Sequence, residues 1–190
     1  MNEHSNWTVE NLLAMKQWQL KELFLALPAP SIRELQGEFK GTLLDTGAFR
    51  SLKNILAYFA LSSSFVNGRW MGKGFKAISD TEGCGYNSYR KSGAVRHILP
   101  MKTHMAPSRF DGKEVFLLDY TTFRSAANSV NMIDEVRKIN DNLYLGIGFW
   151  GYARWQRNIP FFFALSGPPA AYIGIDRPHG ELRSRLSKLT

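Results

Sequence analysis

The chain has 190 residues, 44% of them hydrophobic and 13% aromatic, which is enough apolar material for a folded core and excludes an intrinsically disordered protein. Its formal charge of +8 is spread along the sequence without a recognised nucleic-acid motif, so we expect no nucleic-acid partner. One cysteine, Cys84, excludes an internal disulfide. No segment approaches the ~20 apolar residues of a spanning helix, and no secretory pattern follows Met1. We therefore expect a cytoplasmic protein without stable membrane association.

The first predicted element is an amphipathic helix over residues 9–27. Apolar residues recur there at the spacing of one helix face, at positions 9, 12, 13, 20, 23, 24 and 27. Thr8 suits the N-cap, and Pro28 and Pro30 end the helix. Such a wide apolar face must be buried on the protein's own core or on a second copy, so a homodimer is an open alternative.

Short strands separated by turns follow the helix. Residues 31–34 fit a capping-box turn that leads into a first strand from Gly37, and residues 54–61 favour a helix after that strand. Further strands are predicted at residues 70–78, 86–91, 95–105, 113–120, 132–139, 143–150 and 160–165. About eight short antiparallel strands are typical of a closed barrel, so the predicted class is mainly β. The predicted parts are a helix over 1–30, a barrel domain over 31–166 and an irregular tail over 167–190.

The strand–turn–strand segment at residues 132–150 indicates what the barrel contains. The second strand has one aliphatic face, and its opposite face carries Tyr144, Gly146, Gly148 and Trp150. Rings and glycines that face inward predict a pocket in the barrel. The expected wall of this pocket is a set of large rings, namely Trp70, Tyr86, Tyr144, Trp150 and Phe163. Arg96 and Arg137 are the candidates to bind an acidic group of a ligand.

Three residues are candidates for acid–base catalysis in that pocket. His97 shares an apolar face with Leu99 and Met101, while Asp119 and Tyr120 end a strand that has the pattern of a buried one. Structural roles are the alternative for each of them, such as a buried histidine bonded to a carbonyl. The histidines do not have the spacing of metal ligands, and no cofactor motif is present, so neither a metal nor a cofactor is expected.

Several segments resemble a bacterial family of uncharacterised domains known for a G-x-W-x-G signature. Residues 37–41 (GEFKG) match the signature with Phe39 in place of tryptophan, and residues 70–75 (WMGKGF) are similar to the family's W-x-G-K-x-F segment. Residues 133–146 and the aromatic run at 161–163 resemble the C-terminal half of the family. This resemblance covers most of residues 35–166. It implies a calycin-like barrel, as in lipocalins and fatty-acid-binding proteins, and implies no activity.

These features predict that a barrel pocket binds a small hydrophobic molecule, such as a fatty acid, isoprenoid or polyketide intermediate. One alternative is a cofactor-independent isomerase, cyclase or lyase that acts on such a molecule through His97, Asp119 and Tyr120. A second alternative is a structural homodimer without a ligand, whose interface is the N-terminal helix. The fold alone does not choose among these three functions.

Overall fold

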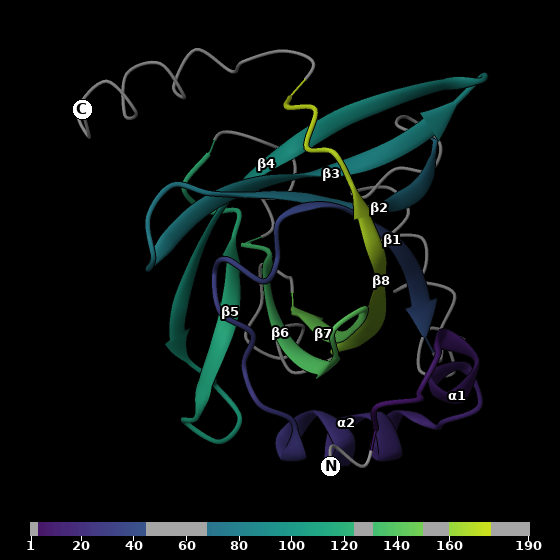
Figure 1. Cartoon of the computed structure of the whole chain (residues 1–190), viewed down its shortest axis with the longest axis vertical. Coiled ribbons are helices and arrows are strands. Elements are labelled where there is room, and N and C mark those ends of the chain that lie inside the picture. The colour runs from purple at the N-terminus through teal and green to yellow at the C-terminus, as the bar shows by residue number, and fades with distance from the viewer. Residues whose placement is uncertain (1–3, 45–67, 124–130, 150–159, 176–190) are drawn as a thin grey trace.

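The structure is a computed structural model of the chain, and it describes residues 4–44, 68–123, 131–149 and 160–175. Eight antiparallel strands form a closed barrel, in which each strand pairs with the next and β8 pairs with β1 (Figure 1). The strands are β1 (Gly37–Leu44), β2 (Arg69–Ala77), β3 (Glu82–Lys91), β4 (Ala94–Pro107), β5 (Glu114–Asp119), β6 (Ile133–Asn140), β7 (Leu143–Phe149) and β8 (Phe161–Ala170). The predicted mainly β class and closed antiparallel barrel are confirmed.

Two strands are longer than the sequence predicts. β3 begins at Glu82 rather than at residue 86, because the Glu82 carbonyl accepts from the N–H groups of Ile78 and Ser79 and so closes a tight turn. β8 continues to residue 170, although an irregular tail is predicted from residue 167. Pro168 and Pro169 lie where the register between β1 and β8 shifts, so their missing N–H groups interrupt no ladder pair. The predicted helix at residues 54–61 lies outside the described residues.

The N-terminal segment forms two short helices, and the prediction of a single helix is wrong. They are α1 (Val9–Leu13) and α2 (Gln17–Ala26). The apolar spacing would place its next inward side chains at positions 16 and 17, but Lys16 and Gln17 are both polar. The chain breaks there, and the Gln19 side-chain oxygen accepts from the backbone N–H of Lys16 at 2.9 Å. The polar residues at positions 16 and 17, where the apolar spacing would continue, indicate this break in the sequence.

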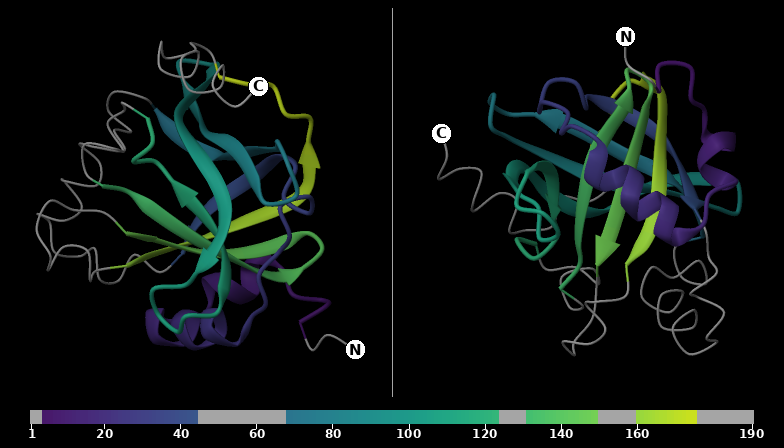
Figure 2. Two further views of the ribbon diagram at one scale, coloured as in Figure 1. Left: turned by 90° about the vertical axis from the view of Figure 1, so that its left-hand side faces the viewer. Right: turned by 90° about the horizontal axis from the view of Figure 1, so that it is seen from below.

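Both helices pack against the outside of their own barrel. Leu12, Leu20 and Phe24 are fully buried in one cluster with the aliphatic face of β7 and with residues of β8. Figure 2 shows α2 lying across these strands when the molecule is seen from below. Most of the helix face considered for a homodimer interface is therefore covered by the protein itself, while Leu13 stays 51% exposed.

The inner face of the barrel is built from rings that fit over glycines. A Cβ atom on Gly146 would lie 2.1 Å from Cζ of Phe163, and one on Gly148 would lie 1.9 Å from Cζ of Phe161. These distances are far inside van der Waals contact, so the space beside both glycines is filled by rings of β8. The expectation that these two glycines leave room for a ligand is therefore wrong, although the expected inward direction of their face is correct.

The interior cluster extends toward both ends of the barrel. At the end where β1 begins, here called the near end, Ile32 and Leu35 are buried in the interior cluster and cover the barrel. The end where β1 finishes is the far end. Partly buried members of the same cluster lie toward both ends, with Leu43, Trp70 and Met132 toward the far end and Ala77 and Met105 toward the near end.

Replacing Gly146 with alanine is expected to lower the free energy of unfolding by about 1–3 kcal/mol, because the new methyl group overlaps the Phe163 ring. Urea denaturation measures this change. Combined with Phe163→Leu, the same substitution should cost less than it does alone, since the smaller side chain leaves space for the methyl group. Equal costs of Gly146→Ala in the two backgrounds would show that the ring does not fill this space.

Candidate functional site

A network of polar side chains lies inside the apolar barrel, and we call Lys73, Asn87, Tyr120 and Asp134 the polar centre. Lys73 is 2% exposed and Asp134 is 0% exposed. Nζ of Lys73 lies 2.9 Å from Oδ2 of Asp134, and it donates to Oδ1 of Asn87 at 2.9 Å and to the Tyr120 hydroxyl at 2.5 Å. Three acceptors around Nζ match the three hydrogens of an ammonium group, so these contacts favour the protonated form of Lys73.

Tyr120 connects the members of the polar centre. Its hydroxyl accepts from the side-chain amide of Asn87 at 3.0 Å and donates to Oδ2 of Asp134 at 3.2 Å. The indole N–H of Trp70 donates to Oδ1 of Asn87 at 3.0 Å. Aromatic rings also surround the ammonium group, since Nζ of Lys73 lies 5.1 Å from the centre of the Phe163 ring.

Burial changes the acid–base properties of the polar centre. It raises the pKa of Asp134 and lowers the pKa of Lys73, while the charge of each ion opposes the shift of the other. Burial, and next the charge of Asp134, raise the pKa of Tyr120 well above its ordinary value, so its phenol stays protonated. The polar centre thus combines one cation, one carboxylate and one neutral hydroxyl.

A β-bulge explains why Trp70 and Lys73 both point inward. Strict alternation would place side chains three residues apart on opposite faces of a strand. The register between β2 and β3 shifts between Trp70 and Gly72, and Gly72 has a φ of 148°. A Cβ atom at this position would lie 1.9 Å from the Phe39 carbonyl oxygen, so only glycine fits the bulge.

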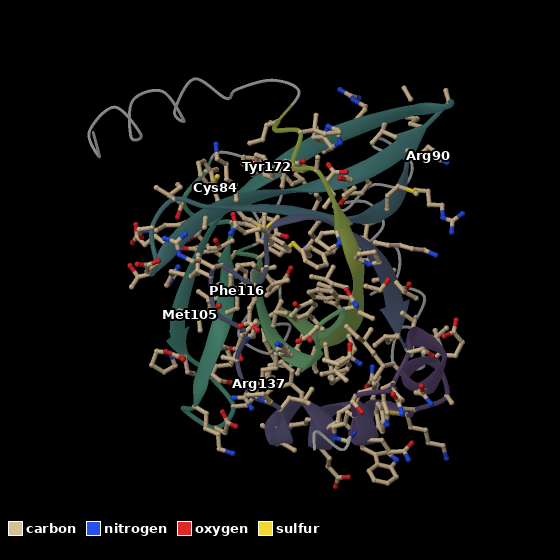
Figure 3. The ribbon with its side chains drawn as sticks, in the orientation of Figure 1. Cys84, Arg90, Met105, Phe116, Arg137 and Tyr172 are labelled. Carbon is tan, nitrogen blue, oxygen red and sulfur yellow. The ribbon has the colours of Figure 1, made fainter. Side chains whose placement is uncertain are left out.

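The structure places some of the predicted site residues inside the barrel. Trp70, Tyr144 and Phe163 belong to the interior cluster, and so does Tyr120. Trp150 lies outside the described residues. Figure 3 shows the ring of Phe116, another member of this cluster, directed into the barrel from β5.

His97 and Tyr86 lie on the outer face of the barrel, and their predicted place in the pocket is wrong. Tyr86 pairs with Gly74, whose neighbour Phe75 points inward, so the Tyr86 side chain points outward. The His97 and Tyr86 rings lie 4.9 Å apart between centres. The alternation used for His97 fails because Leu99 has a φ of 57° and the register between β3 and β4 shifts nearby.

Three further candidates also lie away from the interior. Asp119 accepts from the N–H and hydroxyl of Thr121 at 2.7 and 2.6 Å, which is the role of a turn residue. Arg96 is exposed. Arg137 is fully buried outside the barrel wall, between that wall and α2 (Figure 3). Its NH2 group donates to Oδ1 of Asp111 at 2.7 Å. The predicted positions of Asp119, Arg96 and Arg137 in the barrel pocket are therefore wrong.

Arg137 joins α2 to the barrel. Its NH1 group donates to the carbonyl oxygens of Phe24 and Leu25 at 2.9 and 3.2 Å, close to the end of the helix. A cation at a helix C-terminus stabilises carbonyl groups that have no partner within the helix. The Arg137 hydrogen bonds hold the pKa of Asp111 below its usual range.

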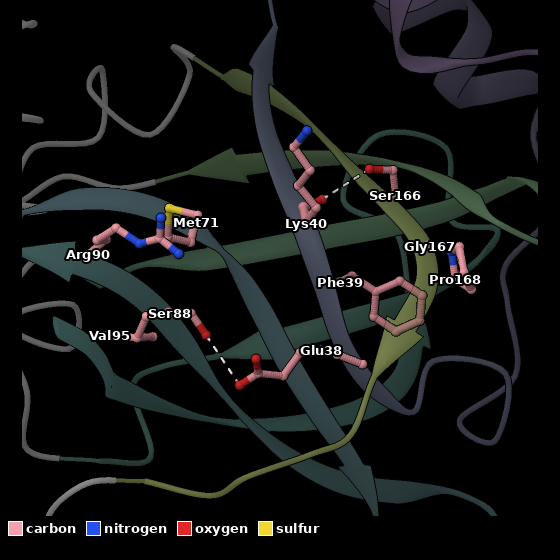
Figure 4. A pocket seen from close by; sticks show the side chains of 11 residues that line it. Glu38, Phe39, Lys40, Met71, Ser88, Arg90, Val95, Ser166, Gly167 and Pro168 are labelled. Atoms are coloured by element: carbon pink, nitrogen blue, oxygen red, sulfur yellow. Dashed lines mark hydrogen bonds between the residues drawn. The ribbon is translucent and has the colours of Figure 1, made fainter. Parts of the chain in front are cut away.

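A separate pocket of about 400 Å³ lies on the outer face of the barrel (Figure 4). Glu38 and Ser88 contribute polar atoms to it, with Lys40 and Arg90 among its other lining residues. Oε1 of Glu38 accepts from the Tyr86 hydroxyl at 2.6 Å. Burial, and next this hydrogen bond, raise the pKa of Tyr86 to about 12.

The C-terminal segment is fixed over Glu38, Tyr86 and His97, which we call the outer cluster. The Tyr86 hydroxyl accepts from the backbone N–H groups of Ile173 and Gly174 at 3.0 and 3.3 Å. Nε2 of His97 lies 3.1 Å from Oε1 of Glu38, the oxygen that also accepts from Tyr86. The outer cluster therefore holds residues that follow β8 against the wall of the barrel.

Lys73, Asn87 and Asp134 are not among the site residues that the sequence predicts. Alternation gave a partial signal for Asp134, because it lies on the same face of β6 as the inward Val136. The bulge at Gly72 concealed the inward direction of Lys73, and Asn87 is adjacent to the register shift between β3 and β4. Sequence alternation alone could not bring these residues together.

The described residues contain neither a membrane-spanning helix nor a metal-binding group. No helix among them is long and apolar enough to cross a membrane. Across the same ranges, no group of three or more His, Cys, Asp and Glu side chains is arranged to hold a metal ion.

The fold and the polar centre define a closed eight-stranded antiparallel barrel protein with a charged group inside. Among solved structures, the chain is similar to a crystal structure of a protein from Thermomonospora curvata, with a TM-score of 0.54 and 16% sequence identity. The alignment covers 83% of this chain and 91% of that chain. This likeness concerns the fold alone. No protein-family model and no curated protein sequence matches the chain.

Proposed function

We propose that the protein binds a small, mainly apolar molecule inside the barrel, with the polar group of that molecule at the polar centre. The observation that carries this proposal is the fully buried Lys73–Asp134 pair in an otherwise aromatic interior. A buried ion pair is often no more stabilising than apolar side chains of similar volume. Ionisable groups with perturbed pKa values gather at functional sites. The pair therefore supports a binding role beyond a purely structural one.

The interior cluster around the polar centre is apolar and rich in aromatic rings, which suits a mainly apolar ligand. Its partly buried members include Leu43, Trp70 and Met132. Burying an apolar chain contributes about 0.8 kcal/mol per methylene. A ligand of about ten carbons would reach roughly micromolar affinity after the entropic cost of binding is subtracted.

A second candidate is an enzyme that transfers protons at the polar centre. The observation that favours it is a carboxylate with a raised pKa, Asp134, beside the hydroxyl of Tyr120. Of the three residues that the sequence suggests for catalysis, only Tyr120 belongs to this arrangement. Chemical change of a bound molecule during incubation would favour the enzyme over the binding protein.

Several finer predictions belong to the same proposal. We propose a cytoplasmic, calycin-like protein, similar to the G-x-W-x-G family and without a nucleic-acid partner. The single cysteine and the spread of the positive charge support the location and the absence of such a partner. A homodimer stays a prediction. The helices already bury much of their apolar surface on their own barrel, so a second copy is not needed to cover that part.

Titration with apolar molecules of varied shape, including alcohols, retinoids and polycyclic aromatics, is expected to change the tryptophan emission with a dissociation constant near the micromolar range. Trp70 would report the binding because its indole N–H contacts Asn87 in the polar centre. Replacing Tyr120 with phenylalanine should weaken binding about five- to tenfold, through loss of one buried hydrogen-bonding group.

Tyr86→Phe is the matched control, because it also removes one tyrosine hydroxyl, but from the outer face of the barrel. It should leave the affinity unchanged. Binding weaker than about 100 μM for every compound would contradict the proposed function. An equal loss of affinity in both tyrosine variants would place the ligand elsewhere.

A further inference from the structure

The two oxygens of the Asp134 carboxylate have different surroundings. Oδ2 lies 2.9 Å from Nζ of Lys73 and accepts from the Tyr120 hydroxyl at 3.2 Å. Oδ1 is buried and has no hydrogen-bond partner among the residues that the structure describes. Buried carboxylate oxygens are ordinarily paired, and an unpaired one is costly. Oδ1 is therefore an acceptor that the hydroxyl of a bound molecule would complete when the side chains packed around it move apart to admit that molecule.

The polar centre presents this acceptor without a free charged donor beside it. All three hydrogens of the Lys73 ammonium group already have acceptors, and the Tyr120 hydroxyl hydrogen is given to Asp134. The two arginines that the sequence suggests for an acidic ligand are placed elsewhere, with Arg96 exposed and Arg137 beneath α2. A ligand carboxylate would bring a second negative charge beside Asp134 in a medium of low polarity.

We infer that the molecule bound in the barrel is a hydrogen-bond donor, of the class of apolar alcohols or phenols, and that its hydroxyl group donates to Oδ1 of Asp134. This inference rests on the proposed function, because it names the ligand class for the same site. It also removes fatty acids from the ligands that the sequence suggests. The ligand's hydrocarbon part would lie among the rings of the interior cluster.

Three ligands with the same chain length test the inference in the unmodified protein. They are 1-decanol, which donates a hydrogen bond, 2-decanone, which only accepts, and decanoate, which is anionic at pH 8. Calorimetric titration is expected to give an affinity for 1-decanol at least about tenfold higher than that for 2-decanone, because a hydrogen bond to a charged group is among the stronger ones. Decanoate should bind most weakly.

Asp134→Asn supplies a second test, through a reversal of selectivity. The new amide oxygen must face the Lys73 and Tyr120 donors, so the amide NH2 group takes the place of Oδ1 and donates instead of accepting. The preference for 1-decanol over 2-decanone should fall to about equal affinity. Circular dichroism checks that the variant is folded, and the unmodified protein decides the question if it is not.

The possible results separate the two proposals. If none of the three compounds binds, and the wider ligand set also fails, the proposed function is wrong. If the three bind with equal affinity, or decanoate binds best, the interior still holds a ligand but the donor class is wrong. An unchanged selectivity in folded Asp134→Asn would likewise overturn the assignment of Oδ1.

Discussion

Replacing Lys73 with methionine is expected to lower the free energy of unfolding by about 3–5 kcal/mol, which is the usual effect of removing one partner from a buried ion pair. The substitution keeps most of the side-chain volume but leaves Asp134 charged, fully buried and without its counter-ion. Chemical denaturation followed by circular dichroism measures the change. Lys76→Met is the matched control, since Lys76 is an exposed lysine of the same strand and its loss should cost less than about 0.5 kcal/mol.

The double variant Lys73→Met with Asp134→Leu distinguishes a functional ion pair from a stabilising one. When both charges are removed, no uncompensated ion stays buried, so the double variant should be more stable than Lys73→Met alone. It should also lose the ligand affinity of the native protein. If the two substitutions instead destabilise the protein additively, the pair contributes directly to stability, and its presence gives no support to a ligand site.

Replacing Arg137 with methionine is expected to lower the free energy of unfolding by about 2–3 kcal/mol and to loosen α2. The guanidinium group of Arg137 donates to the Phe24 and Leu25 carbonyls and pairs with Asp111. Without it these carbonyls keep, among the described residues, only longer hydrogen bonds, from the Leu27 N–H at 3.3 Å and from Nζ of Lys113 at 3.4 Å. Hydrogen bonds to a charged group contribute about 1.5–3 kcal/mol. Amide hydrogen exchange in residues 17–26 should become faster than exchange in the barrel strands.

The dependence on pH gives a second readout for Arg137. Because the folded protein holds the pKa of Asp111 below its ordinary value, this contact stabilises the protein above about pH 4 and its contribution is lost as the pH falls through the lowered pKa. The native protein should therefore lose more stability on acidification than Arg137→Met does. Arg33→Met, which breaks the exposed ion pair with Asp80, should leave both stability and α2 exchange unchanged within about 0.5 kcal/mol. Equal effects of the two arginine variants would contradict the role of Arg137.

Much of the barrel was predictable because period-2 alternation survives where strands are regular. The segment at residues 143–149 shows this clearly, since its aliphatic face packs under α2 and its ring-and-glycine face points inward. The prediction failed on the meaning of the glycines. A sequence shows that Gly146 lacks a side chain, but it does not show that Phe163 fills the resulting space from a strand that is distant in sequence.

The candidate site was only partly predictable, because it depends on register and on bulges. Trp70 and Tyr120 were recognised as potential pocket residues, but Lys73 was not, because the bulge at Gly72 reverses the face expected from alternation. The irregular backbone at Leu99 caused the opposite error and placed His97 inside. The Lys73–Asp134 contact joins β2 to β6 across the barrel, and no local pattern encodes such a contact.

A crystal structure of the protein saturated with 1-decanol tests the central claim most directly. We expect electron density for the alkyl chain among the interior rings, with the hydroxyl oxygen within hydrogen-bonding distance of Oδ1 of Asp134. Density found only in the outer pocket beside Glu38 and Ser88, with the polar centre unchanged, would contradict the claim that the barrel interior is the binding site.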